Sequence, residues 1–200
     1  MNLREDEVAA DPLEQFARWY DEAVVAGVVL PEAMTLTTAT PDGAPSARMV
    51  LLKGVDERGF LFYSNYESRK GRELAENPRA AVVFHWPQTP RRQVTVTGRV
   101  ERLPEEESAE YFRTRPFGSR IGAWASRQSE VIEGRVELER SFAELETEHS
   151  DGDVPRPAWW GGYVLRPDTV EFWQNRPNRL HDRLRYRRSG EDWVLERLSP

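Results

Sequence analysis

Short segments rich in cations and hydroxyl groups are the parts of this sequence that could do chemistry. Arg48–Lys53 reads RMVLLK, and Ser68–Lys70 reads SRK. On a strand, successive side chains point to opposite faces, so Arg48 and Lys53 could contact two different anions. In the first turn of a helix, the two cations of SRK oppose the helix dipole unless an anion sits there. The alternatives are an amphipathic strand with extended cationic ends and a solvated basic turn.

A second pattern has polar groups at helical spacing. Tyr111, Arg115 and Ser119 are four residues apart. At that spacing they share one helical face and could clamp a phosphate. Pro116 interrupts the helix between them, so the face continues only through a new turn. An ordinary surface face is the alternative.

Two polar residues, Gln128 and Ser129, precede a predicted helix at 130–148. We expect Ser129 to be the N-cap of that helix. A cap and an anion ligand are compatible roles, because both use the N-terminal end of the helix.

The strongest concentration of positive charge lies near the C-terminus. Six arginines fall between Arg176 and Arg188, after the segment EFWQ at 171–174. Like charges at this density are unfavourable unless an anionic ligand or an acidic partner offsets them. Alternation would aim Arg179, His181 and Arg183 the same way, and the neighbouring guanidiniums disfavour the protonated form of the histidine. The alternative is a solvated, arginine-rich edge strand that resists aggregation.

Composition excludes several classes of protein. The 200 residues include 28 basic and 34 acidic side chains, a formal net charge of −6, which argues against nucleic-acid and anionic-membrane partners. The absence of cysteine excludes disulfides and thiolate chemistry, and the three histidines lack metal-ligand spacing. With no signal peptide and no membrane span in the sequence, we expect a cytoplasmic protein. Lysine occurs only at Lys53 and Lys70, both inside the candidate anion sites.

These groups require a fold that mixes short strands with helices. Asp11, Pro12 and Glu14 predict a helix that ends near Val28. Further helices are predicted at 67–76, 104–115 and 130–148, and strands at 34–40, 47–53, 59–64, 80–86, 92–103, 161–165, 169–174, 184–188 and 193–197. There is no β-α-β alternation and no G-x-G-x-x-G, which excludes a Rossmann fold. We therefore expect a mainly β fold with α: an antiparallel barrel with helical insertions.

In this order, the segments resemble the pyridoxine (pyridoxamine) 5′-phosphate oxidase family. The match runs from Asp11 to Pro200 through RMVLLK, FYSN, SRK, RQV, YFRTRPFGSRIGAWASRQS, EFWQ, RLHDR and the closing W…RLSP. The resemblance implies one FMN-binding split β-barrel domain over residues 1–200, with residues 1–10 a flexible N-terminal arm. It also implies a homodimer with FMN bound at the subunit interface.

The resemblance also assigns roles by position. It implies FMN contacts from Arg48, Met49, Lys53, Tyr63, Ser64, Arg69, Lys70, Gln93, Gln128, Ser129, Trp173 and Arg183. It implies that Lys53, Tyr111, Arg115 and Ser119 bind the substrate phosphate, and that Arg179 and His181 hold the substrate above the flavin as catalytic residues. The family has an Arg-x-x-Tyr segment that folds over the substrate, whereas no such pair precedes Asp11 here. Either that lid is dispensable or another segment shields the site.

The resulting hypothesis is an FMN-dependent oxidase that converts pyridoxine or pyridoxamine 5′-phosphate to pyridoxal 5′-phosphate and reduces O2 to H2O2. The flavin carries the redox step, and the protein binds and orients the substrate. Three alternatives stay open. They are another split-barrel flavin or deazaflavin oxidoreductase, a non-catalytic carrier of FMN or pyridoxal phosphate, and an arginine-rich module for an acidic partner.

Overall fold

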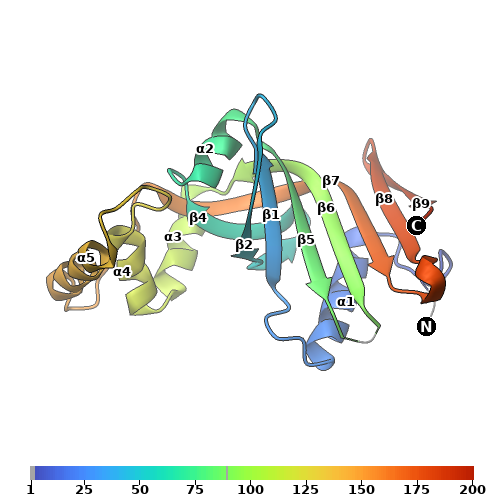
Figure 1. The fold of residues 1–200 in the computed structure, drawn as a ribbon, viewed down its shortest axis with the longest axis horizontal. Helices are drawn as coiled ribbons and strands as arrows, with labels where there is room; N and C mark the ends of the chain where they lie inside the picture. The colour runs from blue at the N-terminus through green and yellow to red at the C-terminus, as the bar shows by residue number, and fades with distance from the viewer. Residues whose placement is uncertain (1–2, 89) are drawn as a thin grey trace.

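The computed structural model describes residues 3–88 and 90–200, which form one large curled sheet with helices packed around it (Figure 1). The helices are α1 (Pro12–Val25), α2 (Arg69–Glu76), α3 (Glu105–Thr114), α4 (Phe117–Ala125), α5 (Arg135–Glu148) and the short 3-10 helix η1 (Pro177–Arg179). The strands are β1 (Ala33–Ala39), β2 (Pro45–Leu51), β3 (Gly54–Asp56), β4 (Gly59–Asn65), β5 (Arg79–Trp86), β6 (Arg92–Arg102), β7 (Trp160–Gln174), β8 (Asp182–Ser189) and β9 (Asp192–Arg197). Within the described ranges, none of the helices is long and apolar enough to cross a membrane.

The long strand β7 organises the sheet. All strand pairs are antiparallel, in the order β2-β1-β5-β6-β7-β4-β3. The first half of β7 pairs with β4, its second half pairs with β8, and β9 extends that edge. Two strands were expected at 161–165 and 169–174, whereas β7 runs unbroken through Arg166 and Pro167. A register irregularity at Gly98 of the neighbouring strand β6 accommodates this stretch. The expected antiparallel split barrel with helical insertions is confirmed.

Helix α1 covers the main core. Asp11 accepts hydrogen bonds from the backbone N–H groups of Leu13 and Glu14, as its predicted cap role requires. Phe16 and Trp19 on its inner face are almost fully buried. The Phe16 ring lies 4.9 Å from the rings of both Phe60 and Phe84, so α1 is held against the middle of the sheet by aromatic packing.

A second, smaller core holds α3, α4 and α5 at one end of the sheet. Phe112, Ile121, Val154 and Trp160 are buried there, and Phe142 of α5 packs against them. Pro116 separates α3 from α4, because a proline ring cannot continue the helix that precedes it. The new turn that the sequence required is therefore a complete second helix.

The described part of the N-terminal arm packs against the C-terminal strands. Leu3 and Ala9 are buried, and the Ala9 carbonyl accepts a hydrogen bond of 2.6 Å from the Tyr186 hydroxyl. Arg197 forms ion pairs with both Glu5 and Asp182. These contacts join residues 3–10 to the β8–β9 edge of the sheet.

Candidate active site

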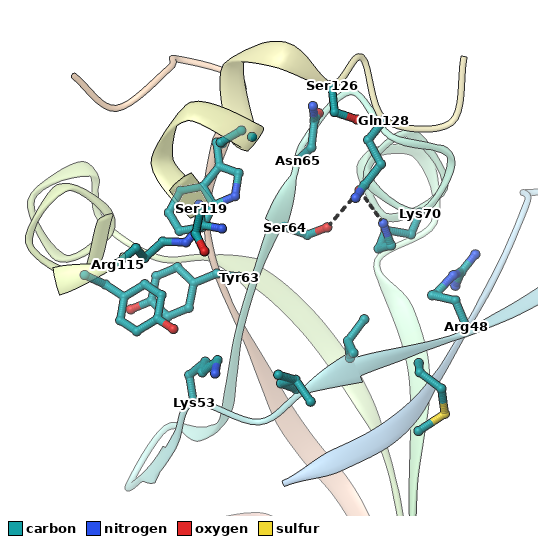
Figure 2. Close-up of a pocket in the computed structure, with 17 residues that line it drawn as sticks. Arg48, Lys53, Tyr63, Ser64, Asn65, Lys70, Arg115, Ser119, Ser126 and Gln128 are labelled. Atoms are coloured by element: carbon teal, nitrogen blue, oxygen red, sulfur yellow. Dashed lines mark hydrogen bonds between the residues drawn. The ribbon is translucent and has the colours of Figure 1, made fainter. Parts of the chain in front are cut away.

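One cavity of about 650 Å³ collects most of the predicted site residues (Figure 2). It lies between the β2 strand with the loop after it, β4, the start of α2, and the α3–α4 pair. Of the residues expected to bind FMN, its lining includes Arg48, Met49, Lys53, Tyr63, Ser64, Lys70 and Gln128. Of those expected to bind the substrate phosphate, it includes Lys53, Tyr111, Arg115 and Ser119. A cavity of this size is within the range that holds a small-molecule cofactor or substrate.

Lys70 marks one end of the cavity. Its ammonium donates hydrogen bonds to Gln128 Oε1 at 2.7 Å and to the Ser68 hydroxyl at 3.1 Å. The Ser64 hydroxyl reaches the same Gln128 oxygen at 3.4 Å (Figure 2). Burial, together with the nearby charge of Arg48, lowers the pKa of Lys70 to about 8. A bound anion at this position would restore the charged form.

The start of α2 lies unusually close to the preceding chain. The Ser68 hydroxyl accepts the Gly71 N–H and so caps the helix, as its place before the helix allows. A Cβ at Gly71 would lie only 2.0 Å from the Tyr66 carbonyl oxygen. A side chain at this position would therefore displace α2 and with it the Lys70 end of the cavity.

The opposite end of the cavity is formed by Lys53, Arg115 and Ser119 (Figure 2), and Tyr111 also belongs to the lining. The Arg115 guanidinium lies 4.5 Å from the centre of the Trp160 ring, and burial lowers its pKa. Its Nη1 is buried and has no hydrogen-bond partner among the described residues. A buried guanidinium nitrogen without a partner is unfavourable. Because Arg115 lines the cavity, an anionic ligand there would be attracted by its positive charge.

Stacked aromatic rings line the wall at this end. The rings of Tyr63 and Tyr111 lie 3.8 Å apart and nearly parallel, and Trp160 stacks 5.5 Å from Tyr63. Burial raises the pKa of Tyr63 to about 12, so its hydroxyl stays protonated at neutral pH. The predicted break at Pro116 does not separate the polar groups, because α4 begins immediately and returns Ser119 to the cavity.

A second group of predicted residues lies in another part of the sheet. Gln93 of β6 pairs with Trp173 of β7, which pairs with Arg183 of β8. Directly opposed residues share a face of the sheet, so these three side chains form one row. The ring of His181 lies 4.6 Å from the ring of Trp173 and extends the group. We call Gln93, Trp173, His181 and Arg183 the C-terminal row; no member of it lines the cavity.

Arg179 does not follow the alternation expected from the sequence. That prediction is wrong because Arg179 lies in η1, where Asn178 and Arg179 have φ angles of 58° and 62°. β8 begins only at Asp182, so a strand pattern cannot apply before it. Arg179 is exposed.

Ion pairs inside the chain offset most of the C-terminal positive charge. Arg183 forms a two-pronged pair with Glu171 at 2.7 and 3.0 Å. Other pairs are Arg176–Asp182, Arg185–Glu196 and Arg187–Glu196, while the Arg188 guanidinium stacks on Trp193. Of the six arginines, Arg179 has neither an ion pair nor a hydrogen bond to another residue within the described chain.

The cap predicted at Ser129 is also wrong. α5 begins at Arg135, with Gly134 before it and no side-chain cap. Ser129 instead lies in the loop after α4, with a φ of 76°. The helix starts later than expected because the β-branched pair Val131 and Ile132 and then Gly134 disfavour helical backbone. Neither Ser129 nor Arg69 lines the cavity, although each adjoins a residue that does.

The cavity includes residues that the sequence analysis did not single out. They are Val50, Leu51, Asn65, Gly122, Ala123, Ser126 and Trp160. Trp160 comes from the first position of β7, far along the chain from α3. The sequence shows two adjacent tryptophans, Trp159 and Trp160, before two glycines, a feature that could have drawn attention to this segment. Only the fold indicates which of the two indole rings lines the cavity.

A family model described as pyridoxamine 5′-phosphate oxidase matches residues 20–149. A second, described as the pyridoxine 5′-phosphate oxidase C-terminal dimerisation region, matches residues 160–200. The chain belongs to the pyridoxine/pyridoxamine 5′-phosphate oxidase family. The resemblance drawn from the sequence motifs is thus confirmed.

Relatives within this family match over nearly the full length. The pyridoxine/pyridoxamine 5′-phosphate oxidase of Salinibacter ruber is 60% identical over 99% of this chain and 93% of its own. That of Rubrobacter xylanophilus is 59% identical over 99% of this chain and 91% of its own. Oxidases of this family are FMN-dependent, and the match to the dimerisation region supports a homodimer.

Solved structures confirm the fold. PhzG from Burkholderia lata, solved in complex with tetrahydrophenazine-1-carboxylic acid, superposes with a TM-score of 0.93 at 36% identity, covering 99% of this chain and 98% of its own. A pyridoxamine 5′-phosphate oxidase-related, FMN-binding protein from Nostoc punctiforme gives a TM-score of 0.73 at 17% identity, covering 92% of this chain and 97% of its own. The second likeness concerns the fold alone.

Proposed function

We propose that this protein is an FMN-dependent oxidase that converts pyridoxine or pyridoxamine 5′-phosphate to pyridoxal 5′-phosphate. The observation that carries the proposal is the presence of two separate cationic ends in one cavity, Lys70 with Arg48 and Lys53 with Arg115 (Figure 2). The cofactor and the substrate each carry one phosphate, so two anion sites are what this reaction requires. Close relatives with this activity support the same conclusion.

The Lys70 end is the part of the chain that fits the FMN phosphate. A buried ammonium with a pKa of about 8 and no ion pair among the described residues is poorly stabilised until an anion arrives. Ser64, Gln128 and Arg48 supply further polar groups around it. We assign the FMN contacts of this chain to Arg48, Met49, Lys53, Tyr63, Ser64, Arg69, Lys70, Gln128 and Ser129.

The Arg115 end is the part that fits the substrate phosphate. Arg115, Tyr111 and Ser119 line the same space as Lys53, and Nη1 of Arg115 is buried without a partner among the described residues. A guanidinium offers two parallel N–H groups to a phosphate, and Lys53 adds a compact second charge. The phosphate would be held at a distance from the reacting carbon, so this end binds and orients.

The site is proposed to be completed by a second copy of the chain. The C-terminal row, with Arg179, contains the remaining predicted residues, yet none of them lines the cavity of its own subunit. The row lies within the matched dimerisation region apart from Gln93 on the adjacent strand. In the homodimer we propose, the row of one subunit faces the cavity of the other and encloses the flavin between them.

His181 acts in this proposal as a hydrogen-bond donor. The backbone N–H of Arg176 donates to its Nδ1 at 3.1 Å. A backbone N–H cannot accept, so the neutral imidazole carries its proton on Nε2. His181 therefore offers an N–H to the substrate, and Arg179 offers a guanidinium with no competing acid.

The redox chemistry would be supplied by FMN held at this site: an acceptor for the hydride from C4′ of the substrate and a donor of two electrons to O2, which becomes H2O2. For the alcohol, the hydroxyl proton leaves and the aldehyde forms directly. For the amine, water releases ammonia from the oxidised carbon. The residues of the chain bind both phosphates, orient C4′ and exclude bulk water.

The visible spectrum of the purified protein tests this function. We expect a flavin band that bleaches on anaerobic addition of pyridoxine 5′-phosphate and returns with O2, with H2O2 produced in steady state. A flavin band that neither vitamer bleaches would indicate an oxidoreductase for another substrate. Bound pyridoxal phosphate or FMN without turnover would indicate a carrier, and a colourless protein that takes up no FMN would overturn the proposal.

A further inference from the structure

Glu73 is a buried acid among the cations at the Lys70 end of the cavity. It lies in the last turns of α2, and only 4% of its surface is exposed. One carboxylate oxygen accepts hydrogen bonds from the hydroxyls of Thr38 and Ser46, the latter at 2.5 Å. The other accepts the Nε–H of Arg69 at 2.8 Å. Glu73 thus connects two strands of the sheet with the first turn of its own helix.

These bonds fix the direction of two arginines. Arg48 donates to Thr38 Oγ1 at 2.6 Å and to the Ser46 hydroxyl, and its Nη2 lies 3.4 Å from Glu73. Arg48 Nη1 also donates to the backbone carbonyls of Leu36 and Ser46 at 3.2 and 3.3 Å. Both hydroxyls are themselves bonded to the carboxylate, so Glu73 holds the guanidinium through them in addition to these backbone contacts. Arg69 is bound to Glu73 through Nε alone, which leaves its two Nη groups without a partner in the described chain.

The charges in this group are matched to one ligand. Arg48, Arg69 and Lys70 carry three positive charges and Glu73 one negative charge, a net of about +2 that complements the −1.5 to −2 of a phosphate monoester at neutral pH. Burial alone would raise the pKa of Glu73, but its hydrogen bonds with Ser46, Thr38 and Arg69 and the charge of Arg48 lower it to about 2. The carboxylate is therefore ionised under all ordinary conditions.

We propose that Glu73 is the positioning residue of the FMN phosphate site, holding Arg48 and Arg69 in the orientation that binds the phosphate. This inference rests on the proposed function, because it assumes that FMN is the ligand at this end. Glu73 does not touch the ligand. It acts through the two arginines and through the hydroxyls of Thr38 and Ser46.

Two opposite effects are possible when the carboxylate is removed. If Glu73 only balanced charge, its loss would leave the site more positive and FMN would bind more tightly. If Glu73 orients the arginines, its loss releases them and FMN binds more weakly. The sign of the change therefore separates positioning from simple charge balance.

The test titrates FMN and riboflavin into flavin-free protein and follows quenching of flavin fluorescence. Riboflavin lacks the phosphate, so it reports on the rest of the site. For Glu73→Gln we expect the Kd of FMN to rise about tenfold, the effect of losing one charge-assisted hydrogen bond, and the Kd of riboflavin to change less than about twofold. Glu107→Gln, which breaks the ion pair with Arg58 outside the cavity, is the matched control and should change neither.

Each other outcome overturns the inference. Unchanged or tighter FMN binding would reduce Glu73 to charge balance, and an equal loss of FMN and riboflavin affinity would make it a general structural residue. Ser46→Ala, which removes one hydroxyl between Glu73 and Arg48, should show the same selective loss if Glu73→Gln does not fold. Failure of the wild-type protein to bind FMN would overturn the proposed function itself, a result distinct from all of these.

Discussion

The cavity and the C-terminal strands both concentrate cations, but they neutralise them differently. In the cavity, Lys53, Lys70 and Arg115 form no ion pair with an acid among the described residues. In the C-terminal strands, Arg183, Arg185 and Arg187 pair with Glu171 or Glu196. The residue types alone would assign anion binding to both regions. Of the cavity cations, Arg48 is paired with Glu73, whereas Lys53, Lys70 and Arg115 are available to ligands. Most C-terminal arginines instead stabilise the strands that carry them.

Arg179 is the exception among the C-terminal arginines, and in the proposed function it acts together with the cavity of the other subunit. It is exposed, unpaired in the described chain, and held at a φ of 62°, a left-handed conformation that costs energy for a residue with a Cβ. Such strain is usually retained where a side chain is needed in one direction. If availability to a ligand decides the role of each cation, substitutions of unpaired cations should change ligand binding or turnover. Substitutions at paired cations should then have little effect on either.

The largest effect is expected for Arg179→Ala. Alanine also has a Cβ and meets the same strain at a positive φ. The substitution therefore removes the guanidinium without changing the energetic cost of the backbone conformation at position 179. We expect kcat/KM for pyridoxine 5′-phosphate to fall about 100-fold or more while the Kd of FMN is unchanged, because Arg179 is assigned to the substrate alone. Steady-state H2O2 production and flavin titration measure the two quantities. Equal losses in both would contradict the division of roles.

A smaller effect is expected for Arg115→Ala. We expect KM to rise about 30-fold with little change in kcat, since the group binds a part of the substrate that does not react. The thermal unfolding midpoint should stay constant or increase, because the variant removes a buried guanidinium whose Nη1 lacks a partner. A loss confined to kcat, or a clear drop in the midpoint, would place Arg115 with the structural cations.

Lys70 predicts a pH dependence of FMN binding. Its pKa of about 8 means that the ammonium is charged below pH 8 and is lost as the pH rises above that value. Bound phosphate favours the charged form, so FMN affinity should fall about tenfold between pH 7 and pH 9. Lys70→Met should bind FMN more weakly at pH 7 and lose most of this dependence. A wild-type affinity that is flat across this range would contradict the assignment.

The smallest effect is expected for Glu196→Gln in β9. This change leaves Arg185 and Arg187 without their shared acid, yet both lie on the solvent side of the hairpin. We expect a shift of less than about 2 °C in the unfolding midpoint and no change in FMN affinity or turnover, because exposed ion pairs contribute little. An increase in affinity for FMN would show that charge alone, without position, controls binding.

Much of the fold could be predicted because its signals are local. Asp11 and Pro12 define the start of α1, and the apolar run at 80–86 followed by the alternation over 92–103 indicates the β5–β6 hairpin. The prediction of Ser129 as a cap failed because cap residues also occur in loops, and Val131 and Gly134 shift the true helix start to Arg135. The unbroken β7 was missed because Pro167 normally ends a strand, whereas here the irregularity at Gly98 accommodates it.

The site was predictable by residue type but not by arrangement. The motifs identified the cavity cations, but they did not indicate that Gln93, Trp173 and Arg183 align across three strands away from the cavity. Trp160 and Glu73 reach their places only through tertiary packing: one stacks beside Tyr63, the other accepts hydrogen bonds from β1 and β2. Contacts between segments far apart in the chain leave no pattern in a single sequence.

The most direct test of the central claim is activity in hybrid dimers. Arg115→Ala disables the cavity and Arg179→Ala disables the region of the C-terminal row, so the two variants can be mixed by subunit exchange and assayed below the wild-type KM. If cavity and row come from different subunits, each hybrid contains one intact site, and an equal mixture should recover about one quarter of wild-type activity. If each site is built within one chain, every site in the hybrid carries a defect. Hybrids that form but recover no activity would contradict the account.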